Sequence, residues 1–392
     1  MAGRPDLVPG AGSRAHPSDA VQPRATYRVQ LHPGFTFTQA AGVAGYLADL
    51  GVSHLYTSPY LQAAPGSAHG YDVVDFTSVS RELGGEQGRG ALCAALSRCG
   101  MSQVIDLVPN HMAAVSPYNR WWTGPLASGR RSRYAGFFDV DWHPPGARIR
   151  DRVLLPLLGG HYGRELEQGN IRLTRHDHGV YVQYFDHLVP VSEDSLRGLA
   201  QGTTLDHAIA ALNRDKEALD AFLERQHYRL SYWRAAGTVL GYRRFFDINS
   251  MVALRMADPE VFREVHRLVL GWMREGTVQG LRVDHPDGLR DPAGYFQALR
   301  REAPGAWIVA EKVLLPGERL RGAWPVQGTT GYEFLNQVLG LLVHPGGEAE
   351  LDACYHRFSG ETRAYRQVLR DAKRRGVREG LGGGLNRLSD LL

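Results

Sequence analysis

The sequence has 392 residues, of which 43% are hydrophobic and 22% are charged, which is the balance of a soluble globular protein. The 45 Lys and Arg residues barely exceed the 41 Asp and Glu residues, and the formal net charge of +4 argues against nucleic acid or an anionic membrane as a partner. Cys93, Cys99 and Cys354 have no CxxC spacing, so they indicate neither a disulfide framework nor a zinc site.

The first residues are rich in Pro, Gly, Ala, Ser and Arg, and they contain no apolar run that could form the core of a signal peptide. No segment approaches the roughly 18 apolar residues that a transmembrane helix needs. We therefore expect residues 1–24 to form a disordered tail, and the protein to be cytoplasmic.

Beyond this tail, short apolar runs alternate with helical patterns. Strands are predicted at residues 27–31, 53–58 and 103–108, with helices at 37–50 and 88–98 between them. This order is typical of a parallel sheet whose strands are joined by crossover helices.

The alternation stops after His111 and resumes near Tyr242. The stretch 112–241 is too long for a loop in a compact domain, so we predict an inserted subdomain that is mostly helical. Its aromatic residues are expected either to line a closed pocket or to form the core of the insertion itself, and these are Trp121, Trp122, Tyr134, Phe137, Phe138 and Trp142.

After the insertion, helices are predicted at 259–275 and 291–301, and strands at 279–284, 306–311 and 329–334. The predicted fold is α/β, a (β/α)8 TIM-barrel type cut short after about six strands, with the insertion after the third strand. The barrel would be formed by residues 25–111 and 242–340, followed by an incomplete helical segment at 341–392.

The last part of the chain shows only helical patterning. Arginines recur at three- and four-residue spacing between residues 363 and 378, which is typical of a solvent-exposed helix face. The glycines at 382–384 lack the Lys-Ser/Thr ending of a phosphate loop, so we expect a flexible break there.

Several predicted strands end in charged residues, and in a barrel of parallel strands such ends form the active-site rim. Arg282 and Asp284 are separated by one residue, so their side chains share a face of the strand. A guanidinium beside a carboxylate keeps the carboxylate ionised and orients it, as a nucleophile requires. A purely structural ion pair is the alternative interpretation of this motif taken alone.

Glu311 ends an apolar run on the next predicted strand. Partial burial there would favour the protonated carboxyl and let it donate a proton near neutral pH, although a solvent-facing glutamate is the alternative. Adjacent strands lie about 4.8 Å apart, and a retaining glycosidase needs its two carboxylates about 5–5.5 Å apart. Asp284 and Glu311 together therefore indicate a nucleophile and a general acid/base.

Three segments resemble, in order, the first three signature regions of the α-amylase clan of glycoside hydrolases, and they are 106–111 (DLVPNH), 280–285 (GLRVDH) and 309–311 (VAE). The pair Tyr71-Asp72 is similar to the clan's contact pair for the sugar at the cleavage site. Within the clan, the sequence resembles the maltooligosyltrehalose synthases in further segments, namely 68–73 (AHGYDV), 242–247 (YRRFFD), 284–289 (DHPDGL) and 328–333 (GTTGYE).

The resemblance implies two catalytic residues, the nucleophile Asp284 and the general acid/base Glu311. The other implied site residues bind the sugar or orient the carboxylates, and they are Tyr71, Asp72, His111, His285, Arg282 and Asp106. For the two histidines, a structural role remains the alternative.

Members of this family convert the reducing-end α-1,4 bond of a maltooligosaccharide into an α,α-1,1 bond by a retaining double displacement. The implied partners are an α-glucan substrate and, by functional coupling, a trehalose-releasing hydrolase. No cofactor is implied, and no His/Asp cluster has metal-ligand spacing. An α-glucan hydrolase or transferase of the same clan, and a non-catalytic α-glucan-binding remnant, are the competing hypotheses.

The clan also uses a third carboxylate, an Asp after the seventh strand, and the sequence offers no match to it. Asp371 and Asp390 lie in helical patterns, and only six of the eight strands of a closed barrel are predicted. We therefore expect the sequence to be the N-terminal portion of a longer enzyme. Its open sheet edges would make it prone to aggregate, and the missing charge would leave little or no turnover.

Overall fold

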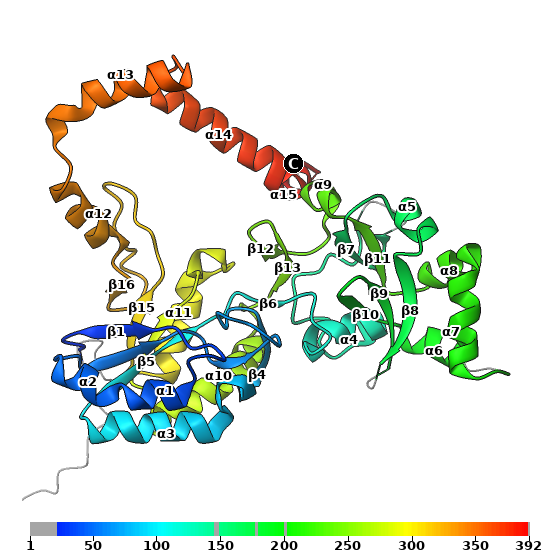
Figure 1. Cartoon of the computed structure of the whole chain (residues 1–392), viewed down its shortest axis with the longest axis horizontal. Helices are drawn as coiled ribbons and strands as arrows, with labels where there is room; N and C mark the ends of the chain where they lie inside the picture. Colours follow the sequence, from blue (N-terminus) through cyan, green and yellow to red (C-terminus); the bar gives the residue numbers. More distant parts are fainter. Residues whose placement is uncertain (1–21, 145–148, 177–178, 200–201, 391–392) are drawn as a thin grey trace, which may run out of the picture.

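The computed structural model describes residues 22–144, 149–176, 179–199 and 202–390. The predicted disordered tail lies almost entirely outside these residues. The described chain has three parts, namely a curled parallel sheet with its helices, a mixed insertion beside it, and a run of C-terminal helices above both (Figure 1).

The central sheet has six strands, all parallel, and their order in the sheet follows their order in the chain. This is the arrangement of successive staves of a barrel, so the prediction of six barrel-type strands is confirmed. The strands are β1 (Thr26–Val29), β2 (His54–Thr57), β5 (Ser102–Leu107), β14 (Gly280–Val283), β15 (Trp307–Ala310) and β16 (Gly328–Thr329).

The middle strands are buried on both faces, as expected for a parallel sheet covered by helices. Figure 1 shows α1, α3 and α10 on one side of this sheet. The predicted helix at 37–50 is two short helices separated at Val43, whose N–H bonds to Ala40 O and ends the first of them. The helices around the sheet are α1 (Phe37–Gly42), α2 (Ala44–Asp49), α3 (Gly85–Arg98), α10 (Pro259–Arg274) and α11 (Pro292–Glu302).

Helix α10 illustrates how the sequence specifies these elements. The Asp258 side chain accepts a hydrogen bond from the Glu260 N–H, and Pro259 occupies the first turn, so the helix start is fully capped. Val261, Val265 and other buried residues recur at three- and four-residue spacing, which turns one face of the helix towards the core.

The inserted region lies between β5 and β14, where it was predicted, but the expectation that it is mostly helical is wrong. Besides helices it contains an antiparallel sheet of three strands and a parallel pair. Apolar residues alternate in β8 and β9, which is the strand pattern that the helical interpretation overlooked. The strands are β7 (Val153–Leu158), β8 (Ile171–His176), β9 (Gly179–Tyr184), β10 (His187–Pro190) and β11 (Tyr228–Tyr232).

The helices of the insertion are α4 (Arg120–Ser128), α5 (Tyr162–Glu167), α6 (Glu193–Leu199), α7 (Leu205–Arg214), α8 (Lys216–Leu223) and α9 (Ala236–Val239). A second antiparallel sheet joins the insertion to the barrel, and it consists of β6 (His111–Ala113), β12 (Arg244–Phe245) and β13 (Ile248–Ala253). Because β6 starts shortly after the end of β5, this sheet lies at the rim of the half-barrel.

The aromatic residues near the start of the insertion form its own core. Trp121, Trp122, Phe137 and Phe138 are all buried, and the rings of Trp122 and Phe138 pack edge to face with their centroids 4.9 Å apart. Of the two interpretations left open by the sequence, the structure supports the core and not a stacking surface for sugar.

Strand β16 is only two residues long, and helix α12 (Tyr332–Leu341) begins where the predicted strand 329–334 should continue. The glycines at 382–384 begin helix α15 (Gly382–Asp390), so the predicted flexible break is also wrong. A Cβ at Gly382 would lie 2.7 Å from Gly237 O, which shows that a small residue is needed where α15 packs on α9.

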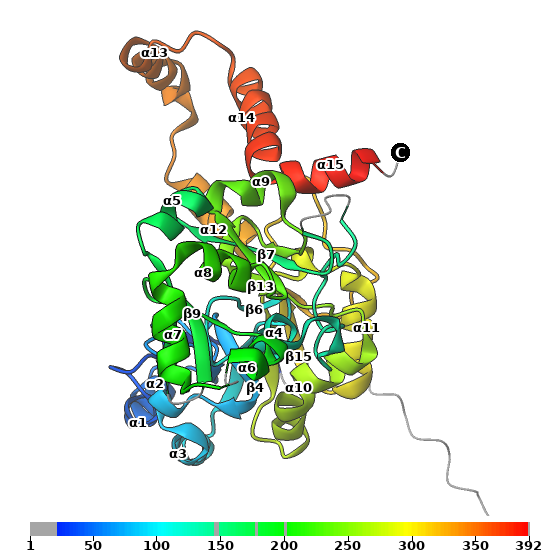
Figure 2. The ribbon, with the colours of Figure 1, turned by 90° about the vertical axis from the view of Figure 1, so that its right-hand side faces the viewer.

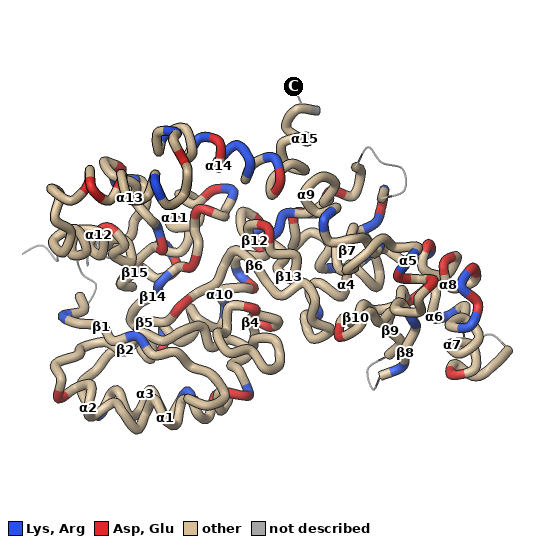
Figure 3. Tube along the Cα trace, turned by 45° about the horizontal axis from the view of Figure 1, so that its top comes forward, with Lys and Arg blue, Asp and Glu red and all other residues tan. Residues whose placement is uncertain are grey.

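Helices α12, α13 (Glu348–Ser359) and α14 (Tyr365–Gly380) contain no buried residue. They extend away from the body of the molecule and return to it where α15 meets α9 (Figure 2). The charged residues of α14 confirm the predicted solvent-exposed face (Figure 3). Helix α12 is different, because its exposed side chains are largely apolar; its last residue, Leu341, is 86% exposed, and Leu342 directly after it is 81% exposed.

No helix among the described residues is long and apolar enough to cross a membrane. Within the same residues, no group of three or more His, Cys, Asp or Glu side chains is placed to hold a metal ion.

The apolar surface of α12 generates a prediction about self-association. Replacing both Leu341 and Leu342 by Glu should lower light scattering at high protein concentration, because large exposed apolar patches drive aggregation. The matched control is Tyr46→Glu, a substitution at another strongly exposed apolar side chain on the separate helix α2. Equal light scattering by the wild type, the double variant and the control would show that the apolar surface of α12 does not drive self-association.

Candidate active site

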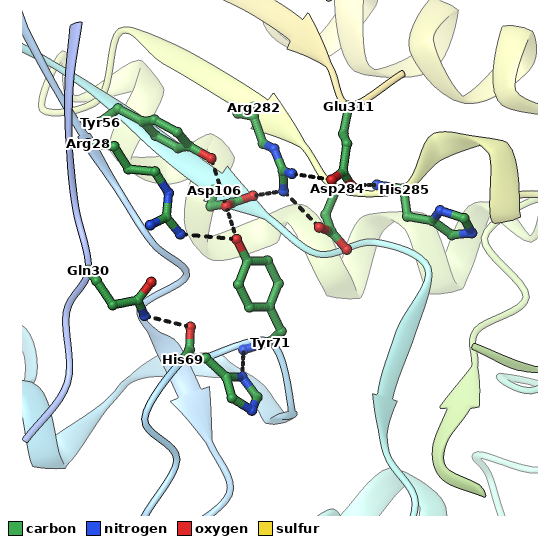
Figure 4. A network of polar contacts seen from close by, with 10 residues as sticks. All are labelled: Arg28, Gln30, Tyr56, His69, Tyr71, Asp106, Arg282, Asp284, His285 and Glu311. Carbon is green, nitrogen blue, oxygen red and sulfur yellow. Dashed lines mark hydrogen bonds and ion pairs between the residues drawn. The ribbon is translucent and has the colours of Figure 1, made fainter. Parts of the chain in front are cut away.

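The side chain of Arg282 is the centre of a buried cluster at the C-terminal end of the sheet (Figure 4). Its Nη1 donates to Asp106 Oδ1 and to Asp284 Oδ1, both at 2.7 Å, and its Nη2 lies 2.8 Å from Glu311 Oε1. The Arg282 side chain is 9% exposed, so this ion cluster is largely shielded from water. One guanidinium therefore holds the two predicted catalytic carboxylates together.

The register of the sheet explains this arrangement. Arg282 pairs with Asp106 on one neighbouring strand and with Val309 on the other. Glu311 lies two residues beyond Val309 and Asp284 two residues beyond Arg282, so all four polar side chains point to the same face. The prediction that Asp284 and Glu311 lie close together on adjacent strands is thus supported by the geometry.

A second layer of polar groups surrounds Asp106, whose side chain is fully buried. Its Oδ2 accepts hydrogen bonds from Tyr56 Oη at 2.9 Å and from Tyr71 Oη at 2.6 Å. Arg28 Nη2 donates in turn to Tyr71 Oη at 3.3 Å. Asp106 therefore has a partner for each carboxylate oxygen, which fixes it as a support for Arg282.

Burial, together with the nearby carboxylates Asp106 and Glu311, raises the pKa of Asp284 to about 7, although Arg282 opposes the shift. Asp284 was expected to be the ionised member and Glu311 the desolvated one. The structure instead buries Asp284, whereas the Glu311 side chain is 25% exposed. Arg282 is shared among three carboxylates, so it only partly offsets the loss of water around the buried Asp284.

Both predicted histidines lie at the rim of the cluster. His111 is buried, its Nδ1 has no hydrogen-bond partner among the described residues, and burial lowers its pKa to about 3. His285 has a left-handed backbone with φ of 43°, and its N–H donates to Glu311 Oε2 at 3.0 Å. Such strain in a non-glycine residue persists where the surroundings impose it, which is common at functional sites.

An aromatic wall connects the two histidines. The Phe245 ring lies 4.2 Å from His111 and 5.0 Å from His285, measured between ring centroids, and Phe246 lies 4.5 Å from His285. These phenylalanines come from the β12–β13 hairpin of the sheet that joins the insertion to the barrel, so this connecting sheet contributes directly to the rim of the site.

Tyr71 joins the cluster, but Asp72 does not contact it among the described interactions. Asp72 accepts a hydrogen bond from Ser67 Oγ and lies 3.7 Å from His69 Nδ1, so it stabilises its own turn. Gly70 has φ of 81°, and a Cβ there would approach Pro59 O to 2.3 Å, so only glycine fits this turn.

The sequence analysis did not identify Tyr56, Arg28, Phe245 or Phe246 as site residues. Tyr56 and Arg28 lie near the ends of β2 and β1 and are paired in register, so position on the strand was an available signal. Phe245 and Phe246 lie within the segment 242–247, but nothing in the sequence spacing indicated that they contact His285.

A cavity of about 450 Å³ lies between the segments that follow His285 and Glu311 in the chain. Lys312 Nζ bridges it, with Asp287 Oδ2 at 3.0 Å and Glu318 Oε1 at 3.3 Å. Its volume is in the range of small-molecule sites. The lining comes from Asp287, Leu289, Arg290, Asp291, Pro292, Ala293, Lys312, Glu318, Arg319, Leu320, Arg321 and Trp324.

Comparisons with known proteins agree with this geometry. Residues 43–156 match the model of the alpha amylase catalytic domain. A Mycobacterium tuberculosis protein described as a maltooligosyl trehalose synthase is 41% identical over 371 residues, which are 93% of this chain and 44% of the relative. An intracellular maltogenic amylase of Bacillus subtilis is 33% identical over 99 residues, which are 25% of this chain and 16% of the relative.

Two solved structures share the fold over nearly the whole chain. Maltooligosyltrehalose synthase from Arthrobacter ramosus matches with a TM-score of 0.81 and 39% identity over 93% of this chain and 44% of that chain. A structure described as DSM5389 glycosyltrehalose synthase matches with a TM-score of 0.82 and 36% identity over 94% of this chain and 48% of that chain. The chain thus spans less than half the length of these relatives.

The parallel half-barrel with carboxylates at its rim, together with the match of residues 43–156, makes the chain similar to the alpha-amylase type of catalytic domain. More particularly, the chain is related over 93% of its length to the maltooligosyltrehalose synthases. The resemblance stated from the sequence is therefore confirmed.

The raised pKa of Asp284 leads to a prediction about stability. A carboxyl whose pKa is higher in the folded than in the unfolded chain stabilises the protein fully below the unfolded value of about 4, and this contribution is lost as the pH rises through about 7. Asp284→Asn should therefore raise the melting temperature at pH 8 by a few degrees, at about 2–4 °C per kcal/mol, and change it little at pH 4.

Differential scanning calorimetry at the two pH values measures this effect. Asp49→Asn, at an exposed position on α2, is the matched control and should leave both melting temperatures unchanged. A variant Asp284→Asn that is less stable at pH 8 than at pH 4, relative to wild type, would contradict the assigned shift.

Proposed function

We propose that Asp284 is the nucleophile and Glu311 the general acid/base of a retaining glycosyl transfer on α-glucans. The observation that carries the proposal is the bonding of both carboxylates to the two Nη atoms of the single buried residue Arg282. This bridging holds the two groups at a separation compatible with the about 5–5.5 Å used by retaining enzymes.

In the first step, an oxygen of Asp284 attacks the anomeric carbon of the glucosyl unit and Glu311 protonates the departing glycosidic oxygen. Arg282 holds Asp284 in line and favours its ionised form. The Glu311 side chain is 25% exposed and is accessible to a leaving group, whereas Asp284 is largely buried. The product of this step is a covalent glycosyl-enzyme.

We propose further that the reaction is an intramolecular transfer, which forms an α,α-1,1 bond at the reducing end of a maltooligosaccharide. The released glucose would have to remain, turn, and present its anomeric hydroxyl to Glu311 acting as base. The Phe245 and Phe246 wall against His285, with the cavity that the segments after His285 and Glu311 line, would retain the sugar and exclude water. Two displacements at one carbon then restore the α configuration.

Binding of the sugar would involve His111, whose buried and unpartnered Nδ1 is free to bond a hydroxyl group, and also Tyr71, Asp72 and His285. The two relatives of known structure are described as a maltooligosyltrehalose synthase and a glycosyltrehalose synthase, which supports the proposal of an intramolecular transfer here. We also propose a cytoplasmic location, supported by three free cysteines, and coupling to a hydrolase that releases trehalose.

A third carboxylate of the kind used by the clan does not follow a strand after Glu311 in the part of the chain that the structure describes. Such a group stabilises the charge of the transition state. We therefore propose that the 392-residue chain forms the covalent intermediate but turns over slowly. The alternatives are an α-glucan hydrolase and a glucan-binding protein without activity, and the following experiments distinguish them.

Incubation with 5-fluoro-α-D-glucosyl fluoride should label Asp284, as detected by mass spectrometry of peptides. Labelling should accelerate as the pH rises through about 7, because only the ionised carboxyl attacks. Glu311→Gln should still be labelled, since fluoride leaves without protonation, and Asp284→Asn should not. Label on another residue, or equal labelling of Asp284→Asn, would refute the assigned nucleophile.

Incubation with maltopentaose distinguishes the transfer from hydrolysis. We expect slow loss of reducing ends without release of free glucose, at a rate far below one turnover per second, whereas typical enzymes reach about 1–10³ per second. A gain of reducing ends would favour the hydrolase. Maltopentaose affinity that is unchanged in Asp284→Asn, with no product from any variant, would favour a binding protein.

A further inference from the structure

The guanidinium of Arg243 is surrounded by four oxygen acceptors from separate parts of the chain. Its Nε donates to Asp139 Oδ2 at 3.0 Å, and its Nη2 donates to Leu254 O at 2.6 Å. Its Nη1 donates to Asn110 Oδ1 at 2.8 Å and to Gly288 O at 2.7 Å. Two backbone carbonyls, one amide and one carboxylate therefore converge on a single cation.

These acceptors belong to four separate segments of the chain. Asp139 is in the first part of the insertion, and Leu254 follows β13. Asn110 follows β5, and Gly288 ends the short 3-10 helix η6 (Pro286–Gly288) that comes directly after the proposed nucleophile. Arg243 thus joins the insertion to two strand ends of the catalytic rim.

Tight packing transmits the position of Gly288 to the site. A Cβ at Gly288 would lie 2.5 Å from His285 Cδ2 and 2.9 Å from Asn110 Oδ1, so the His285 ring rests directly on this backbone. The N–H of His285 donates to Glu311 Oε2. A displacement of η6 would therefore move both the His285 ring and one hydrogen bond of the proposed acid/base.

Arg243 also fixes the aromatic wall from the other side. It directly precedes β12, and Phe245 on that strand packs against both His111 and His285. Its backbone is anchored as well, because Ala253 N–H donates to Arg243 O at 2.9 Å and Arg243 N–H donates to Asp139 O at 3.2 Å. Arg243 therefore holds both η6 and the start of the aromatic wall that Phe245 and Phe246 form.

We propose that Arg243 is a positioning residue, which sets the distance between the Phe245 wall and the His285–Glu311 pair and so shapes the sugar-binding rim. The identity of the ligand as a sugar rests on the proposed function, whereas the contacts of Arg243 do not depend on it. A planar guanidinium with five N–H donors can satisfy four acceptors in different directions, which the three donors of a lysine ammonium cannot do in the same way.

The test compares Arg243→Ala with Arg255→Ala. Arg255 Nε donates to Asp139 Oδ1 at 3.1 Å, so the control removes a cation from the same carboxylate but none from the catalytic rim. Labelling of Asp284 by 5-fluoro-α-D-glucosyl fluoride gives a half-saturating reagent concentration and a maximal rate for each variant. We expect Arg243→Ala to raise the half-saturating concentration at least tenfold with a smaller effect on the maximal rate, and Arg255→Ala to change neither more than twofold.

Methylguanidine at millimolar concentration should restore the half-saturating concentration of Arg243→Ala, because it can occupy the vacated space and bond the same four oxygens. Methylammonium should restore less. An unchanged half-saturating concentration in Arg243→Ala, or an increase equal to that of Arg255→Ala, would overturn the inference. If Arg243→Ala does not fold, Arg243→Lys takes its place, and wild-type behaviour of that variant would equally overturn it.

Hydrogen exchange separates this inference from the proposed function. In Arg243→Ala, the amides of residues 244–247 and 285–288 should exchange faster than in wild type and in Arg255→Ala, while those of β1 and β2 should not change. Failure of the wild type to be labelled would refute the assigned chemistry alone, whereas unchanged exchange in the two segments would refute the role of Arg243 alone.

Discussion

The structure of the site depends on the burial of one guanidinium among three carboxylates. Desolvation of ions is costly, and the attraction between opposite charges compensates for it only when the geometry is favourable and the remaining hydrogen bonds are satisfied. Arg282 meets this condition for Asp106, which has a partner on each oxygen, but meets it less well for Asp284, whose pKa is raised to about 7. The resulting excess of negative charge is concentrated where a cationic transition state would form.

That cluster exists because of sheet register, not because of loop conformation. Asp106, Arg282 and the residues around Glu311 are placed by paired positions on three adjacent strands, whose backbones hydrogen-bond to each other. Rigid strands hold charges more exactly than loops do, so the carboxylates need no rearrangement to act together. The other parts of the rim, Phe245, Phe246 and His285, are attached to this frame through the β12–β13 hairpin and through Arg243.

The sequence was sufficient for the barrel strands and the central site residues because both have strong local signals. Buried parallel strands appear as apolar runs, and the strand period alone places Arg282 and Asp284 on one face. It was insufficient where tertiary contacts decide the outcome. The glycines of α15 read as a break but are required by close packing on α9, and the strand period does not show that the surrounding residues enclose Asp284 more than Glu311.

The insertion was predicted only in part from the sequence. Its position followed from an interrupted alternation of strands and helices, but its strands were overlooked because they are short and separated by polar turns. The contribution of Phe245 to the rim could not be foreseen, since it depends on where the β12–β13 hairpin is held in space.

The position of the insertion also has a consequence for the order in which the chain can fold. Strands β5 and β14 are neighbours at the centre of the sheet, yet Asp106 and Arg282, which bond across them, are 176 positions apart. Closing so long a connection is entropically costly unless its ends are already near each other, and non-local parallel pairing is intrinsically slow. The antiparallel strands β6 and β13 flank the insertion and pair directly. Formation of that sheet, which is itself a pairing between distant parts of the chain, would bring the two halves of the barrel wall together, so the catalytic cluster should be among the last parts of the molecule to assemble.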